Sequence, residues 1–128
     1  MKAIGILSKC IAPLTAGAIW WLSSQSTLPV VKGILGVDKV QHMLIYAVLA
    51  VGVGFWFPCA RWKNHAMQTL AFVACIASLY GATDEIHQLF VEGRNCNAWD
   101  WVADTVGAIL GATLYAKIWK MRCSIPSH

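Results

Sequence analysis

The segment AMQTLAFVACIASLYGATDEIHQLFVEGR, residues 66–94, contains an uncharged, largely apolar stretch followed directly by a cluster of ionisable side chains. The uncharged part, residues 66–83, approaches the roughly 20 helical residues that cross the ~30 Å core of a bilayer. The ionisable part then brings carboxylates, a histidine, a glutamine and an arginine between residues 84 and 94. This order predicts a membrane helix whose end carries a polar site.

The composition of the whole chain supports a membrane protein. Of its 128 residues, 58% are hydrophobic and only 12% are charged, too few charges to cover the surface of a soluble domain of this length. We therefore expect one integral membrane domain over residues 1–128. The net charge of +4 is interpreted as a signal of orientation in the membrane, and no nucleic-acid partner is expected.

Four segments are long enough to span a membrane: residues 4–22, 40–57, 66–89 and 99–119. Their unbroken apolar character indicates helices, because backbone groups in lipid must be hydrogen-bonded within their own segment. Tryptophans near the predicted span ends match an aromatic belt: Trp20, Trp21, Trp56, Trp62, Trp99, Trp101 and Trp119. The expected fold is an all-α bundle of four transmembrane helices with an outward-facing polar cavity.

The charged residues divide between the two ends of these spans. Seven of the ten basic residues fall at the end that carries both termini: Lys2, Lys9, Arg61, Lys63, Lys117, Lys120 and Arg122. The other end has three basic residues and all six acids: Lys32, Lys39, Arg94, Asp38, Asp84, Glu85, Glu92, Asp100 and Asp104. The positive-inside rule then places both termini in the cytoplasm and the acid-rich end outside the inner, cytoplasmic membrane.

In the third span, Asp84 and Gln88 share a helical face, with Glu85 beside it. The two carboxylates fall at the negative end of the helix dipole, so they require a cation or protonation if they are desolvated. Lys39, Arg94, His42 and a divalent metal ion are the candidates. The alternative is that both acids are simply solvated at the interface.

The second and fourth spans bring further polar groups to the same level. His42 and Tyr46 lie on one face of the second span, near Asp38 and Lys39. In the fourth span Asn97 is expected to cap the helix, with Asp100 either in that cap or in the site. Asp104 lies one turn deeper, where capping does not explain it. Gly107 and Gly111 form a GxxxG pattern that favours close helix packing.

The five cysteines have no metal-binding spacing, and their odd number argues against a disulfide framework. Cys10 and Cys75 lie in apolar segments and are expected to be packing residues.

Several of these motifs together resemble the VanZ-like family. The resemblance rests on SSQ after the first span, DKVQHMLIYAVL at the second, and YGATDEIHQLFVEGRNCNAWDWVADTVGAILG across the third and fourth. It covers most of the chain, although Glu92 stands where many members have proline. The resemblance implies a small bacterial membrane protein, and a link to teicoplanin resistance, with which the name-giving member is associated.

The resemblance and the polar residues together lead to a functional hypothesis. The protein is expected to act at the outer leaflet on a lipid-linked or phosphate-bearing envelope head group. The expected acid–base residues are His42, Asp84, Glu85 and Asp104, and the expected binding residues are Lys39, Tyr46, Gln88, Arg94 and Asp100. The alternatives are a non-enzymatic module that binds antibiotic or lipid, and a structural subunit whose ion pairs fix helix register while a partner protein or second copy functions. No particular cofactor is predicted, although a site for a divalent cation made of Asp84, Glu85, Asp100 and Asp104 is chemically feasible.

Overall fold

The computed structural model describes residues 2–26 and 36–123, and every regular element in these ranges is an α-helix. The helices are α1 (Lys2–Lys9), α2 (Ile11–Ser23), α3 (Val37–Gly54), α4 (Cys59–Asn64), α5 (Ala66–Gln88) and α6 (Ala98–Cys123). The all-helical prediction is therefore confirmed for the part of the chain that the structure describes.

Three helical segments are long and apolar enough to cross a membrane: Gly5–Ser23, Val37–Gly54 and Ala66–Gln88. Large apolar side chains such as Leu14 and Leu79 are exposed on the outside of the protein, where lipid would surround them. Helix α6 has 26 residues and packs beside the others, but it is less apolar. The fourth span, and with it the four-span bundle, stays a prediction.

The first span is broken at Cys10, between α1 and α2. Pro13 has no N–H, so the carbonyl of Lys9 cannot receive the usual hydrogen bond from the residue four positions on. The indole Nε1 of Trp56 donates to this carbonyl instead, at 2.9 Å. This contact satisfies the exposed backbone group and attaches the first span to the end of α3.

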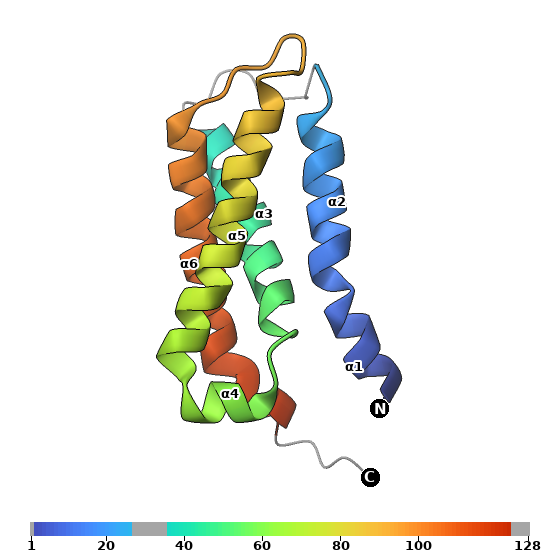
Figure 1. Ribbon diagram of the computed structural model, residues 1–128, viewed down its shortest axis with the longest axis vertical. Helices are drawn as coiled ribbons and strands as arrows, with labels where there is room; N and C mark the ends of the chain where they lie inside the picture. Colours follow the sequence, from blue (N-terminus) through green and yellow to red (C-terminus); the bar gives the residue numbers. More distant parts are fainter. Residues whose placement is uncertain (1, 27–35, 124–128) are drawn as a thin grey trace.

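The long helices run alongside one another, as Figure 1 shows. The start of α1, the short helix α4 and the end of α6 lie at one end, and the loop between α5 and α6 lies at the other. The basic and acidic residues are separated between these two ends as the sequence predicts. Lys32, assigned above to the acidic end, lies outside the described residues.

Small residues let α6 pack closely against α3. A Cβ atom added at Gly107 would lie 2.8 Å from Cα of Met43, and one added at Gly111 would lie 2.8 Å from Cα of Ala47. Both distances are too short for a carbon–carbon contact. The packing role predicted for the two glycines is confirmed, and it fixes the distance between the helices that carry His42 and Asp104.

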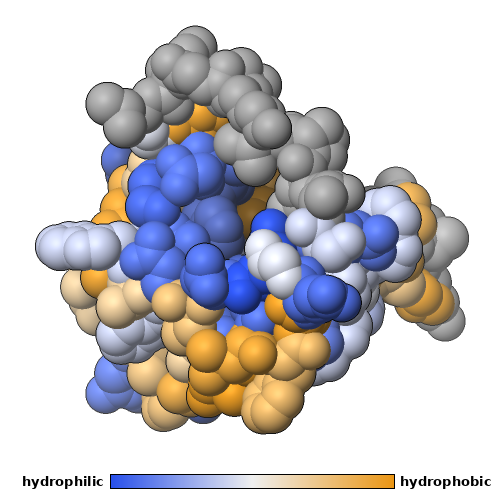
Figure 2. Space-filling view, turned by 90° about the horizontal axis from the view of Figure 1, so that it is seen from above, coloured by the Kyte–Doolittle hydropathy of each residue, from blue (hydrophilic) through white to orange (hydrophobic). Residues whose placement is uncertain are grey.

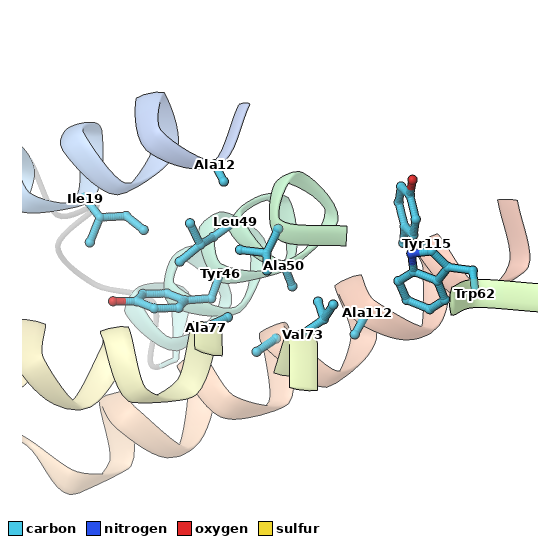
Figure 3. Close-up of a cluster of buried hydrophobic side chains, with 12 residues drawn as sticks. Ala12, Ile19, Tyr46, Leu49, Ala50, Trp62, Val73, Ala77, Ala112 and Tyr115 are labelled. Carbon is cyan, nitrogen blue, oxygen red and sulfur yellow. The ribbon is translucent and has the colours of Figure 1, made fainter. Parts of the chain in front are cut away.

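The hydrophobic core continues to the end of the bundle that carries the basic residues. Trp62 and Tyr115 are in contact there, with ring centroids 5.0 Å apart (Figure 3). Trp62 is completely buried and donates from Nε1 to the carbonyl of Gly54 at 3.1 Å. Its assignment to the aromatic belt was therefore wrong. Hydropathy places Trp62 near the end of a predicted span, but the residue belongs to the short helix α4, which directs the indole into the core.

Cys59 and Cys123 form a disulfide that joins the start of α4 to the end of α6. The argument from an odd number of cysteines missed this bridge because an odd count leaves at least one cysteine unpaired but does not prevent two others from pairing. Cys10, Cys75 and Cys96 are free. The bridge lies at the base-rich end, which the positive-inside rule assigns to the cytoplasm, whereas disulfides are rare in that compartment.

The positive-inside rule places the base-rich end in the cytoplasm, whereas the disulfide favours the opposite orientation. Labelling of single-cysteine variants distinguishes these two orientations. We expect a variant that retains only Cys96 to react with a membrane-impermeant maleimide in spheroplasts, and a variant that retains only Cys123 to be protected until the membrane is permeabilised. Slight desolvation, followed by the nearby Glu85 carboxylate, raises the pKa of the exposed Cys96 thiol. The reaction therefore needs a mildly alkaline buffer, since the thiolate is the reactive form. The reverse labelling pattern would place the acid-rich end in the cytoplasm.

Candidate functional site

Hydrophilic residues gather at the acid-rich end of the bundle, and Figure 2 shows them together in the middle of this end, beside hydrophobic residues. Four helices contribute to the cluster. Helices α2 and α5 finish here, and α3 and α6 begin here. The polar residues therefore come from one end of each helix, while the rest of each helix is available for packing and for lipid.

A cavity of about 310 Å³ opens within this polar cluster. One part of its wall is apolar and comes from Ile19, Leu22 and Ile45. The remaining lining residues are Ser23, Gln41, His42, Tyr46, Asp84, Gln88 and Arg94. An apolar wall beside several polar groups suits an amphiphilic ligand.

Asp84 is buried on the cavity wall, with only 2% of its surface exposed. It accepts hydrogen bonds from the hydroxyl of Ser23 at 2.5 Å and from Nε2 of Gln88 at 3.2 Å. The Ser23 side chain also contacts the Ile19 carbonyl, at 2.6 Å, so it is held at the end of α2. Among the described residues, the partners of this carboxylate are thus uncharged donors, whereas the sequence predicted either a cation or protonation.

Glu85 lies beside Asp84 and is also buried. Its Oε2 accepts the backbone N–H of Asn97 at 2.9 Å, and its Oε1 lies 3.4 Å from Nε2 of Gln88. Asn97 in turn caps α6, because its side-chain oxygen accepts the N–H of Trp99 at 3.0 Å. The predicted cap is confirmed, but Glu85 of α5 replaces Asp100 as the partner of the Asn97 N–H.

His42 and Asp104 form a direct pair between α3 and α6, with Nδ1 of His42 2.7 Å from Oδ1 of Asp104. Asp104 is completely buried, and its second oxygen, Oδ2, has no partner among the described residues. The hydroxyl of Tyr46 is likewise buried without a described partner. Asp104 Oδ2 and the Tyr46 hydroxyl are therefore available to form hydrogen bonds with a ligand or with water.

Lys39 lies between two carboxylates, at 2.7 Å from Asp38 and in contact with Asp100. Its ammonium group is therefore already engaged by the protein, and Lys39 does not line the cavity. This geometry suits a role in holding the start of α3 against the start of α6 better than the predicted contact with an anionic ligand.

Arg94 reaches the cavity from the loop after α5. Gly93 precedes it with a φ of 80°, a conformation that L-residues with side chains rarely adopt. The chain turns there, and the N–H of Arg94 bonds to the carbonyl of Val91 at 3.1 Å. Its side-chain Nε is buried and has no partner in residues 2–26 or 36–123. A buried guanidinium nitrogen without a partner suggests that an anion belongs beside it.

The structure divides the nine predicted site residues into two groups. Those that line the cavity are His42, Tyr46, Asp84, Gln88 and Arg94, and those that lie outside its wall are Lys39, Glu85, Asp100 and Asp104. Sequence reasoning did not select Ser23, Gln41 or Asn97 as site residues. The SSQ motif that begins at Ser23 was the available signal for the first of them.

These features define a class of protein: an all-helical membrane protein with a polar site at one end of its helices. Within that class, the chain belongs to the VanZ/LLP1 family, whose model matches residues 7–120, nearly the whole chain. Neither the comparison with curated proteins nor the comparison with solved structures found a match.

Proposed function

We propose that this VanZ-like protein binds the phosphate-bearing head group of an envelope lipid in the cavity beside Arg94. The single observation that carries the proposal is that Arg94 lines the cavity while its buried side-chain Nε has no partner among the described residues. A guanidinium group presents a planar set of donors that matches a phosphate. Its position next to apolar residues supports a lipid in preference to a free anion.

The apolar part of the wall would receive the first part of the lipid tail. Ile19 and Leu22 come from α2 and Ile45 from α3, and they line the same cavity as the polar residues Asp84 and Gln88 of α5. A ligand held in this way would keep its head group at the acid-rich end, which we place at the outer leaflet of the cytoplasmic membrane because of the positive-inside rule. A link to teicoplanin resistance would follow if the bound lipid were a cell-wall precursor.

Thermal unfolding with short-chain lipids tests the proposal. We expect a short-chain phosphatidic acid to raise the melting temperature of the detergent-solubilised protein, because a ligand that binds only the folded state stabilises it. The zwitterionic phosphatidylcholine of the same chain length should have little effect, and inorganic phosphate should have a smaller effect than phosphatidic acid.

A cavity-blocking variant makes this test specific. Leu22→Trp places a larger side chain in the cavity wall and should abolish the stabilisation by phosphatidic acid. Leu14→Trp is the matched control, because Leu14 lies on the same helix but is 71% exposed and outside the cavity. Equal stabilisation of both variants by phosphatidic acid would show that the lipid binds elsewhere.

A further inference from the structure

Three side chains from three different helices meet beside the cavity. His42 of α3, Glu85 of α5 and Asp100 of α6 each offer a ligand atom, and these atoms lie within 4.8 Å of one another. We propose that His42, Glu85 and Asp100 bind a divalent transition-metal ion. This inference goes beyond lipid binding and does not depend on it.

The orientation of His42 supports the metal site. Its Nδ1 contacts Oδ1 of Asp104 at 2.7 Å, so Nε2 is the ring nitrogen left for a metal ion. Histidines that bind metals usually direct their other nitrogen to a carboxylate or carbonyl, which fixes the ring and makes it a better ligand. Asp104, completely buried behind His42, is placed for this supporting role.

The balance of charges provides a second and independent reason. Two buried carboxylates, Asp84 and Glu85, have only uncharged hydrogen-bond donors among the described residues. Asp104 adds a buried oxygen without a partner. Lys39 contacts Asp38 and Asp100, and none of its ion pairs among the described residues involves Asp84, Glu85 or Asp104. Concentrated negative charge away from water favours a bound cation.

The donor atoms indicate the kind of ion. Mg²⁺ and Ca²⁺ prefer sites made of oxygen alone, whereas an imidazole nitrogen with two carboxylates suits Mn²⁺ or Zn²⁺. Lys39 would compete with such an ion for Asp100, because it contacts that carboxylate directly. When a metal ion binds Asp100, Lys39 can keep its ion pair with Asp38, which is the more exposed of its two carboxylate partners.

Electron paramagnetic resonance of Mn²⁺ tests the site in the untagged, detergent-solubilised protein. Mn²⁺ suits this test because thiols are poor ligands for it, so the free cysteines do not interfere. We expect one bound Mn²⁺ per chain. Glu85→Gln and Asp100→Asn, which preserve side-chain shape, should each weaken binding by at least about tenfold, and Asp104→Asn should weaken it by about 10- to 100-fold through His42.

Three further variants make the result specific. Glu92→Gln and His87→Gln are the controls and should leave Mn²⁺ affinity unchanged, because Glu92 is an exposed loop residue and His87 stacks on Trp20 instead. Lys39→Met should strengthen Mn²⁺ binding by removing the competing cation. The proposal is overturned if the wild-type protein binds neither Mn²⁺ nor Zn²⁺, or if the control variants lose as much affinity as Glu85→Gln. Circular dichroism of each variant would confirm that it is folded.

Discussion

Replacement of Gly107 by leucine is expected to prevent stable folding. The first side-chain carbon alone would lie 2.8 Å from Cα of Met43, and the obstacle is backbone, which no change of rotamer relieves. Helices α3 and α6 would have to separate along their contact. Overpacking of this kind costs up to about 3 kcal/mol when side chains can adjust, and we expect at least that loss here because the backbone must move.

Thermal unfolding in detergent would measure this effect. The matched control is Gly17→Leu on α2, where an added Cβ meets nothing within 4 Å. Gly17→Leu should leave the melting temperature nearly unchanged, since the new side chain would point away from the protein. Similar melting temperatures for the two variants would show that α3 and α6 do not pack as closely as described.

Replacement of Arg94 by alanine is expected to remove lipid binding while the fold is retained. Arg94 takes part in none of the ion pairs among the described residues, so its loss leaves no described carboxylate without an ionic partner. The residue also lies in a loop, outside the packed helices. We therefore expect a melting temperature close to wild type without ligand, and no increase in that temperature with phosphatidic acid.

Two further variants test whether the planar guanidinium and its position in the cavity, and not positive charge alone, are needed for lipid binding. Arg94→Lys keeps the charge but lacks the planar fork, so it should recover little of the stabilisation if the arginine holds phosphate through two hydrogen bonds. Lys63→Ala removes an exposed cation at the other end of the protein and should bind lipid normally. If Arg94→Ala unfolds the protein instead, Arg94 belongs to a structural network and the assignment of the site is wrong.

The sequence predicts the helices well, because the length and apolarity that define them are local properties. The third span was predicted at residues 66–89, and α5 runs from Ala66 to Gln88. The start of α3 was placed three residues too late. Hydropathy stops at the polar Asp38 and Lys39, whereas the helix begins after Gly36, whose φ of 91° sets the turn. A search for apolar segments leaves out polar residues at the end of a helix, even when they belong to that helix.

The level of the polar residues was also predictable, but their pairing was not. Helix ends at one depth bring Asp84, His42 and Asp104 to the same region of the molecule. Which side chains touch depends on the rotation of each helix about its axis, and the sequence does not specify this rotation. The same reason explains why the hydrogen bonds of the buried acids to two uncharged partners, Ser23 and the Asn97 backbone, were not predicted.

The central claim is that the cavity beside Arg94 holds a phosphate-bearing lipid, and native mass spectrometry of the protein extracted from its own membrane tests it most directly. Wild-type protein should retain one phosphate-bearing, anionic lipid per chain at a collision energy that removes other lipids, and Arg94→Ala should retain none under the same conditions. Equal retention of the same lipid by wild type and Arg94→Ala, or retention of zwitterionic lipid alone by the wild type, would contradict the claim.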